Sequence, residues 1–261
     1  MLSKIKSKIY LNTKVLEIKK QDDIFCVLTN KGEFRAKNVV LASGGISYAE
    51  LGTSDIALKV AKDFGINYTE FSPALVPFTL QKDEFFMKNI SGVSVDVTIN
   101  DTFKGGLLFT HKSISGPAVL SASLFWTKGK IKIDFLNDFI INYKENKQAS
   151  THLPLAKSFI KEYLNSNNIQ DKPMNKYSDS EKSIINRLKS YEFAPAGTLG
   201  FNKAEVCRGG VSLKELSKNY ESKKGLFFIG ECLNATGILG GFNIHFAFAS
   251  AKKLANYLNR Q

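Results

Sequence analysis

The sequence predicts an α/β fold in which one domain is interrupted by an inserted, β-rich module. Two short strands at 39–42 and 226–229 are apolar throughout, which is typical of parallel strands covered by helices on both faces. Between them, residues 93–99 alternate strictly, as half-exposed antiparallel strands do. The two ends of the chain are therefore expected to form one domain, and the middle another.

A run of antiparallel strands is expected at the start of the chain. Residues 13–18 and 24–29 alternate apolar and polar side chains. The turn at 30–32 then returns the chain through Phe34 toward the buried strand at 39–42. The sequence predicts a β-meander that leads into a central parallel strand.

A helix is expected after the central strand. It should begin at Thr53 or Ser54 and end at Gly65, because apolar residues recur on one face and glycine commonly follows the end of a helix. Beyond it, Ser72-Pro73 marks the predicted junction with the inserted module.

The inserted module is predicted to be antiparallel β at first and helical later. After the strand at 93–99, the turn 100–101 reverses the chain and 103–110 returns. Residues 115–117 (Ser-Gly-Pro) resemble a helix cap with proline in the first turn. Weaker patterns indicate a strand at 129–135 and helices at 154–164 and 178–189.

The pattern of the first domain returns near residue 195. The apolar strand at 226–229 leads through a glycine-rich loop into a long amphipathic helix at 242–258. We therefore predict one domain in two segments, 1–73 and 195–261, with an inserted β/α domain at 74–194.

Length and composition favour a globular protein of the cytoplasm. The chain has 261 residues, of which 43% are hydrophobic, enough for one large domain or a domain with an insertion. We find no apolar run of membrane-spanning length and no hydrophobic leader, so no membrane association is expected. Three widely spaced cysteines are interpreted as reduced core thiols.

The basic charge raises the question of a nucleic-acid partner. The net charge is +12, but only four of the 36 basic residues are arginine, and the lysines are spread along the chain. We interpret them as a solvated surface and expect no nucleic acid as a partner. Salt-sensitive binding to DNA or RNA stays a third hypothesis.

Two glycine-rich turns carry the expected chemistry. The strand at 39–42 ends in Ser43-Gly44-Gly45, where a ligand could approach the backbone closely, although an ordinary structural turn is an equal alternative. The second turn is Gly230-Glu231, followed by a glycine loop at 237–241 before the last helix. A helix start offers unpaired N–H groups and a positive dipole end to an anion, or to the charge on a reduced flavin.

These blocks together resemble the BaiN-like family of bacterial NAD(P)/FAD-dependent oxidoreductases, also called the aminoacetone oxidase family. The resemblance extends over most of the chain and is carried by 42–45, 47–48, 51–52, 107–111, 115–120, 203–206, 209–211, 221–223, 225–231 and 240–243 in family order. It implies a Rossmann-like, ββα three-layer FAD/NAD(P)-binding domain interrupted by an inserted mixed β and α domain. It also implies FAD as cofactor, with NAD(P)H as a candidate co-substrate.

The resemblance assigns cofactor contacts residue by residue. Val15 matches the position whose backbone meets the adenine, and Asn234 stands where the family usually has Asp, which puts one ribityl contact in doubt. The other implied cofactor residues are Ala42, Ser43, Gly44 and Gly45 along the cofactor, Gly230 and Glu231 near the pyrophosphate and ribityl chain, and Gly240, Gly241, Phe242 and Asn243 facing the flavin.

One expected feature of the family is absent from the sequence. The chain contains no GxGxxG, and the family's first βαβ unit, which carries that loop, would precede Met1. We therefore expect an incomplete FAD-binding domain that folds poorly or binds FAD weakly by itself. A separately encoded N-terminal fragment is the expected partner that would complete it.

Catalytic residues are harder to predict. His111 is a weak candidate for proton delivery, because it lies in a matched block just before the predicted cap at 115–117. Packing or capping at that helix is an equal alternative. The three histidines are scattered, so no metal site is predicted.

Two functions of different classes follow. The first is a flavin oxidoreductase that uses NAD(P)H or a small organic substrate, as a truncated or split chain. The second is a catalytically inactive remnant or accessory subunit that does not bind FAD by itself. The missing loop favours the remnant, and the intact glycine and glutamate positions favour the enzyme.

Overall fold

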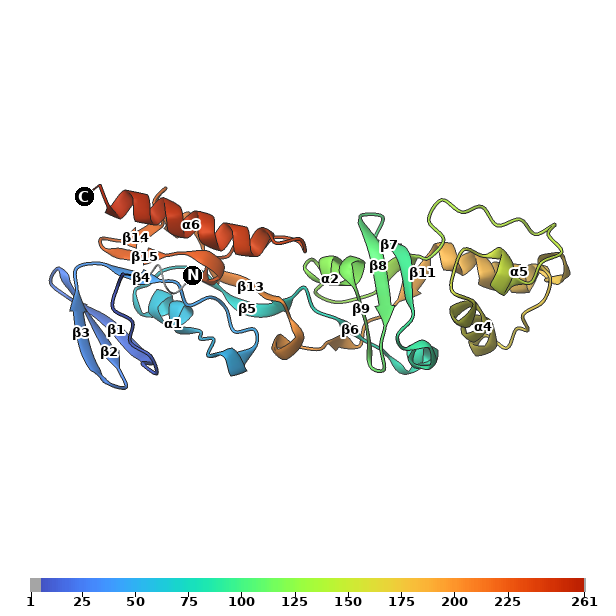
Figure 1. The fold of residues 1–261 in the computed structure, drawn as a ribbon, viewed down its shortest axis with the longest axis horizontal. Helices are drawn as coiled ribbons and strands as arrows, with labels where there is room; N and C mark the ends of the chain where they lie inside the picture. The colour runs from blue at the N-terminus through green and yellow to red at the C-terminus, as the bar shows by residue number, and fades with distance from the viewer. Residues whose placement is uncertain (1–5, 261) are drawn as a thin grey trace.

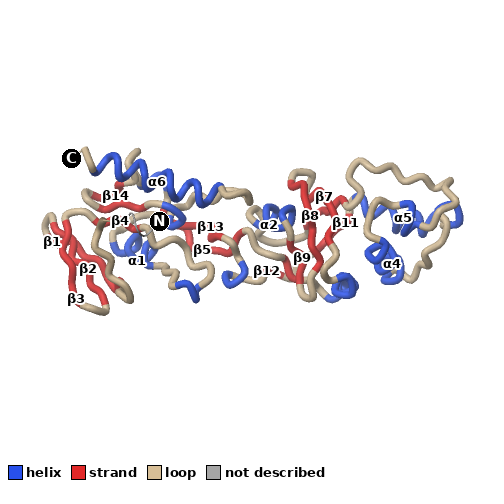
Figure 2. Tube along the Cα trace, viewed as in Figure 1, coloured by secondary structure: helices blue, strands red, loops and turns tan. Residues whose placement is uncertain are grey.

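The computed structural model describes residues 6–260 and shows an elongated molecule (Figure 1). Both ends of the chain, blue and red in Figure 1, build one lobe, and the middle of the chain builds the other. We call these the terminal lobe and the middle lobe. Figure 2 shows the strands concentrated in three places along the long axis, with helices α4 and α5 at the far end of the middle lobe.

The terminal lobe combines strands and helices from both ends of the sequence: β1 (Val15–Gln21), β2 (Ile24–Thr29), β3 (Gly32–Ala36), β4 (Val39–Leu41), α1 (Ile56–Asp63), β5 (Tyr68–Ala74), β13 (Val206–Val211), β14 (Glu221–Lys223), β15 (Leu226–Phe228) and α6 (Phe242–Leu258). The middle lobe contains β6 (Phe78–Thr79), β7 (Ser94–Ile99), β8 (Phe103–Phe109), β9 (Ser113–Ser115), α2 (Pro117–Ser123), β10 (Ile131–Asp134), α3 (Ala149–His152), α4 (Lys157–Ser166), α5 (Asp179–Asn186), β11 (Tyr191–Phe193) and β12 (Gly197–Thr198).

A parallel pair of buried strands forms the centre of the terminal lobe. β4 and β15 are parallel, with Leu226 opposite Val39 and Phe228 opposite Leu41, and the sheet order is β14-β15-β4. All three residues of β15 are buried, which explains why this strand is apolar on both faces. The predicted parallel strands and the α/β fold class are confirmed.

The predicted meander and helix are present with shifted ends. β1, β2 and β3 pair in sequence order and are antiparallel. Helix α1 begins at Ile56, later than expected, because the Ser54 hydroxyl accepts a hydrogen bond from the Ile56 N–H (3.1 Å) and holds the preceding turn outside the helix. Gly65 follows its end with φ +64°, as expected for a residue after a helix.

A two-stranded antiparallel ribbon, β5 with β13, runs from the terminal lobe toward the middle lobe (Figure 1). Ser72 and Pro73, predicted as a junction, lie inside β5, opposite Arg208 and Cys207. Gly209 has φ +101°, and a β-carbon there would lie 2.3 Å from the Glu70 carbonyl oxygen. Only glycine therefore fits where the two strands approach.

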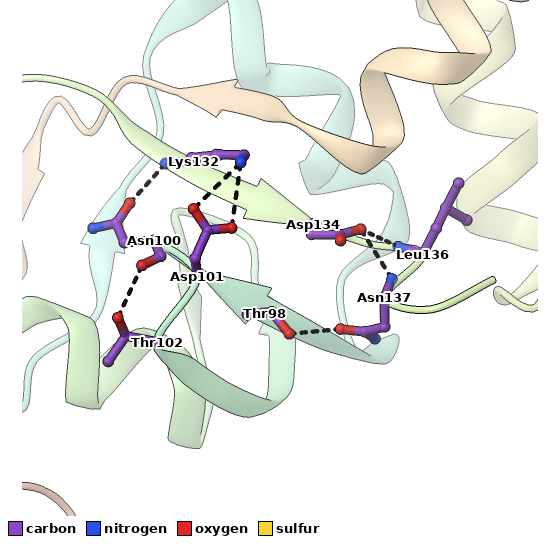
Figure 3. Close-up of polar contacts among 8 residues, drawn as sticks. All are labelled: Thr98, Asn100, Asp101, Thr102, Lys132, Asp134, Leu136 and Asn137. Atoms are coloured by element: carbon purple, nitrogen blue, oxygen red, sulfur yellow. Dashed lines mark hydrogen bonds and ion pairs between the residues drawn. The ribbon is translucent and has the colours of Figure 1, made fainter. Parts of the chain in front are cut away.

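The middle lobe is built on a seven-stranded sheet in the order β11-β10-β7-β8-β9-β6-β12. The predicted strand at 93–99 and its hairpin are confirmed, with Asn100 and Asp101 at the tip in left-handed conformations. The tip is anchored on β10: the Lys132 N–H donates to Asn100 Oδ1 (2.9 Å), and Lys132 Nζ contacts both Asp101 oxygens at 3.3 Å (Figure 3).

The helix predicted after the cap at 115–117 is present. Ser115 belongs to β9, and Gly116 takes the N-cap position of α2, with Pro117 in the first turn. A β-carbon at Gly116 would lie 2.5 Å from the Gly106 carbonyl oxygen, so close packing on β8 requires glycine at this position. Helix α5 begins with a capping box between Ser178 and Glu181, near its predicted start.

Among residues 6–260, none of the helices has the length and apolar character needed to cross a membrane.

Candidate functional site

The two predicted turns meet at one edge of the central sheet. β4 leads into Ser43-Gly44-Gly45, and β15 leads into the short helix η8 (Gly230–Cys232). Because β4 and β15 are parallel neighbours, both turns emerge at their carboxyl ends. In open α/β sheets this edge is where ligands bind.

Glu231 joins three segments at this edge. Its Oε2 accepts a hydrogen bond from the Gly45 N–H at 3.3 Å, and its Oε1 accepts one from the Cys207 N–H at 2.8 Å. The carboxylate therefore links the first glycine turn to strand β13 and is itself carried by η8. Glu231 therefore supports the first glycine turn, and the position near the pyrophosphate and ribityl chain that the resemblance implied stays a prediction.

Gly45 is in close contact with a cysteine that the sequence-based prediction did not assign to the site. A β-carbon on Gly45 would lie 2.6 Å from Cys207 Sγ and 2.8 Å from its Cβ. The buried Cys207 sulfur accepts the Ile46 N–H at 3.1 Å and lies 3.3 Å from the Ser47 hydroxyl. Cys207 therefore shapes the first glycine turn.

The other two cysteines differ in position: Cys232 ends η8, next to Glu231, and Cys26 lies in β2. Cys232 is buried and free, and its burial raises the pKa of the thiol to about 12, so the thiol is protonated at neutral pH. Cys26 is partly exposed in β2.

Two hydroxyl groups beside these turns are buried without partners. Ser43 Oγ and Thr53 Oγ1 have no hydrogen-bond partner among residues 6–260. A buried polar atom without a partner is uncommon in a native protein and is expected to contact a ligand or an ion. Ser43 belongs to the first glycine turn, and Thr53 lies between η2 (Ala49–Leu51) and α1. Ala42, which precedes Ser43, is exposed.

A cavity of about 890 Å³ lies next to the first turn. Val15, predicted to meet an adenine, is in its wall together with Thr53. The remaining lining residues are Asn12, Thr13, Lys14, Leu16, Ile46, Ala49, Gly52, Ser54, Asp55, Ile56 and Lys59. A cavity of this size is within the range of cofactor sites.

The second glycine loop ends at the start of α6. Gly241 is its N-cap, with φ +84°, and the side chain of Asn243 holds the loop from inside the helix: Oδ1 accepts the Gly237 N–H (2.7 Å) and Nδ2 donates to the Gly237 carbonyl (3.0 Å). Gly240 and Phe242 are exposed beside them. The first turn of this 17-residue helix therefore presents backbone N–H groups at its positive dipole end.

Helix α6 packs directly on the second predicted turn. The Gly230 N–H donates to Ser250 Oγ (3.0 Å), and a β-carbon on Gly230 would lie 3.6 Å from Ala247 Cβ. Gly230 has φ +71°, a conformation that favours glycine. The structure thus brings Gly44 and Gly45 against Glu231, and the neighbouring Gly230 against α6.

His111 is separate from this cluster. It is exposed in the turn between β8 and β9, which Thr110 and Ser113 close through their own hydrogen bonds. No contact described among residues 6–260 joins His111 to the predicted cofactor residues. Within the same range, no group of three or more His, Cys, Asp or Glu side chains is placed to hold a metal ion.

The parallel strands, the two glycine turns at their carboxyl ends and the helix that follows define a Rossmann-like α/β protein. A family model, the HI0933-like protein Rossmann domain, matches residues 1–257, and the chain belongs to this family. At the level of the family, this membership supports a flavin-type oxidoreductase and the sequence-based resemblance.

Three curated relatives match nearly the whole chain. Two are named ribosomal RNA dihydrouridine synthase: one from Haemophilus influenzae is 34% identical over 98% of this chain and 69% of its own length, and one from Escherichia coli is 34% identical over 92% and 65%. A 3-dehydro-bile acid delta(4,6)-reductase from Clostridium scindens is 28% identical over 95% and 68%. The chain therefore spans about two thirds of the length of these relatives.

Proposed function

We propose that this chain forms the flavin-facing part of an FAD-dependent reductase that acts on a uracil ring in ribosomal RNA. One observation supports FAD as the cofactor: at the edge of the sheet, Glu231 joins the first glycine turn to β13. In that turn the Ser43 hydroxyl is buried and has no partner among residues 6–260. The proposed substrate is inferred from the two relatives that are named ribosomal RNA dihydrouridine synthase.

The residues at this edge suit an extended dinucleotide. The cavity lined by Val15 and Thr53 would take the adenosine, and the unpaired Ser43 and Thr53 hydroxyls would hydrogen-bond polar groups of the cofactor. Gly44, with φ +68°, keeps the backbone free of a side chain where the cofactor would pass. The first turn of α6 would face the pyrimidine edge of the flavin.

Reduction of the C5–C6 double bond of uracil requires one hydride and one proton. A bound flavin, once reduced by NAD(P)H, supplies the hydride. The chain itself would contribute position and electrostatics: Asn243 holds the glycine loop at Gly237, and the N–H groups at the start of α6 would stabilise negative charge on a flavin bound there. His111 as the proton donor stays a prediction, because it is exposed outside the cluster.

The RNA substrate departs from the sequence-based expectation of a small molecule and no nucleic acid. That expectation stays a prediction, and the C. scindens relative favours it. We prefer RNA because the two relatives at 34% identity share the name, against 28% for the bile-acid reductase, and because a net charge of +12 attracts a polyanion.

A direct assay separates the two substrates. The full chain, with FAD, NADH or NADPH and a completing βαβ fragment, is incubated with an unmodified ribosomal RNA transcript, which is then digested to nucleosides. Mass spectrometry should detect dihydrouridine, and omission of the nicotinamide should abolish it. Consumption of a 3-oxo-4,6-diene steroid in a parallel reaction, with no dihydrouridine, would reject RNA in favour of a small substrate.

We also propose that a further βαβ unit completes the cofactor site. Within residues 6–260, β4 pairs along one edge only, which leaves the other edge of this parallel strand open. On α6, Ile244 and Phe248 are four residues apart and expose 67% and 56% of their area. An open edge and an apolar helix face on one lobe are the surface that a strand and its helix would cover.

Retention of flavin by the chain tests whether a βαβ unit completes the cofactor site. With an added βαβ fragment that carries a GxGxxG loop, the chain should retain flavin after desalting, whereas alone it should retain little. Ile244→Ser with Phe248→Ser should abolish the gain, because these changes remove the apolar face. Ile140→Ser, at a residue 82% exposed in the middle lobe, is the matched control and should change nothing.

The outcomes also bear on the rival hypothesis of an inactive remnant. Retention by the chain alone would contradict the need for a completing unit and still support a flavoprotein. If no combination retains flavin, the chain is better described as a catalytically inactive remnant or accessory subunit.

A further inference from the structure

An exposed pair of stacked aromatic rings lies outside the cofactor site. Phe125, just after α2, exposes 64% of its area, and its ring stacks on Phe103 at the start of β8, with centroids 5.4 Å apart and an interplanar angle of 22°. Two adjoining rings form a larger continuous apolar surface than a single exposed side chain does. We call these two rings the aromatic platform.

Arg208 holds the platform next to the cofactor edge. Its Nη1 donates to the carbonyls of Leu124 (2.8 Å) and Trp126 (3.3 Å), the two residues that flank Phe125. Arg208 follows Cys207, whose N–H binds Glu231. The backbone that carries Phe125 is therefore pinned to the strand that supports the first glycine turn.

The platform also adjoins the second glycine loop. Leu124 is buried in a small apolar cluster, against which Leu120 of α2 and Leu239 of the glycine loop pack. Figure 1 shows the N-terminal end of α6 and its preceding loop beside α2. A base stacked on Phe125 would thus lie close to the entrance of the proposed flavin site.

The Phe103 side of the platform is equally well fixed. Phe103 follows the β7–β8 hairpin tip, which is anchored on Lys132 through Asn100 and Asp101 (Figure 3). A fixed aromatic surface loses little conformational entropy when a planar ligand stacks on it.

Two lysines that form no ion pair among residues 6–260 lie close to the platform residues in the sequence. Lys104 follows Phe103, and Lys128 lies in the turn that Trp126 closes by donating its indole N–H to the Gly129 carbonyl (2.8 Å). Among residues 6–260, Lys104 and Lys128 form no ion pair, whereas Lys130 and Lys132 pair with Glu192 and Asp101. Exposed aromatic faces beside unpaired lysines are typical of surfaces that bind single-stranded nucleic acid.

We propose that the aromatic platform binds an unstacked base of single-stranded RNA beside the uridine to be reduced, with Lys128 against the adjoining phosphate. This inference rests on the proposed RNA substrate and assigns its binding surface. The platform would position the RNA, and it takes no part in the reduction itself.

The single tryptophan of the chain provides the readout. Trp126 is adjacent to Phe125, so a base that stacks on the platform should quench its fluorescence. Titration of the full chain with a uridine-rich, single-stranded RNA 12-mer at low salt should give saturable quenching and a matching rise in the anisotropy of labelled RNA. Neither signal requires flavin or turnover, so this test is independent of the reductase assay.

Variants then locate the site. Phe125→Ala should weaken RNA binding by roughly 5- to 100-fold, the effect of losing one base–aromatic stack, and Phe125→Trp should restore binding in the anisotropy assay. Lys128→Gln should lower the salt dependence by about 0.7 in the log–log slope, the contribution of one phosphate contact on a single strand.

Phe85→Ala is the matched control. Phe85 is also an exposed phenylalanine with a lysine beside it, Lys88 lying 3.2 Å from its ring centroid in η3 (Lys82–Ile90). Equal loss of binding in both phenylalanine variants, or full binding by Phe125→Ala, would overturn the proposal. Absence of RNA binding by the wild-type chain would also overturn it, as would self-association that Phe125→Ala abolishes.

Discussion

Glu231→Ala is expected to destabilise the chain by about 2 to 4 kcal/mol and to abolish flavin retention in the completed protein. The variant leaves the Gly45 and Cys207 N–H groups without their acceptor, and each unsatisfied buried donor costs about 1 to 3 kcal/mol. The first glycine turn also loses its tie to β13. Urea unfolding and flavin retention after desalting measure the two effects.

Two further variants separate the role of this carboxylate from that of any glutamate. Glu231→Gln keeps one oxygen acceptor and should lose about half as much stability. Glu215→Ala, in η7 (Leu213–Glu215), removes a carboxylate that accepts one exposed hydrogen bond from Asn67, and should cost less than about 1 kcal/mol. Equal losses for Glu231→Ala and Glu215→Ala would show that Glu231 does not support the turn.

Gly45→Ala is expected to cost about 1 to 3 kcal/mol, as overpacking a filled interior does. The new β-carbon would lie 2.6 Å from Cys207 Sγ and 2.8 Å from Cys207 Cβ. The Cβ atom is fixed by the backbone of β13, and moving the sulfur would break its contacts with the Ile46 N–H and the Ser47 hydroxyl. Because the turn must shift, flavin retention should fall as well. Thermal unfolding of the purified variant measures the loss.

A double-mutant cycle tests the cause of this loss. Cys207→Gly removes both clashing atoms, so Gly45→Ala should cost less in that background than in the wild type. Gly106→Ala is the control, because a β-carbon there meets nothing closer than 3.5 Å. A cost for Gly45→Ala that is the same in both backgrounds would mean that the clash with Cys207 is not the reason for glycine at this position.

Local sequence patterns were sufficient to predict several strands and one hairpin. The strands at 39–42 and 226–229 and the hairpin at 93–101 could be predicted because apolar periodicity and turn residues act over a few neighbouring positions. Errors arose at element ends. The helix expected from Thr53 or Ser54 begins at Ile56. The cap predicted within 115–117 is present, but the pattern did not show that Gly116 must be glycine because it packs on Gly106 of β8.

The same distinction applies to the candidate site. The glycine turns and Glu231 were assigned from the resemblance, but Cys207 was interpreted as an ordinary core thiol and Arg208 was given no role. Their partners are distant in sequence: the Cys207 sulfur accepts the N–H of Ile46, 161 residues away. The adjacent Gly209-Gly210 was the one local signal of a crowded strand, because both glycines have positive φ beside backbone atoms.

The sequence by itself determined the α/β class, the two buried strands, the glycine turns after them and the helix that follows the second turn. Only the tertiary structure decided that one carboxylate serves both the turn and β13 and that Phe125 is exposed next to Leu124, which packs with the glycine loop. It also decided that the Ser43 hydroxyl oxygen is buried without a partner among residues 6–260. The physical reason is the distance along the chain over which each kind of interaction acts. Backbone preference and apolar periodicity act between near neighbours, whereas hydrogen-bond pairing, crowding and exposure depend on segments that meet only after the chain has folded.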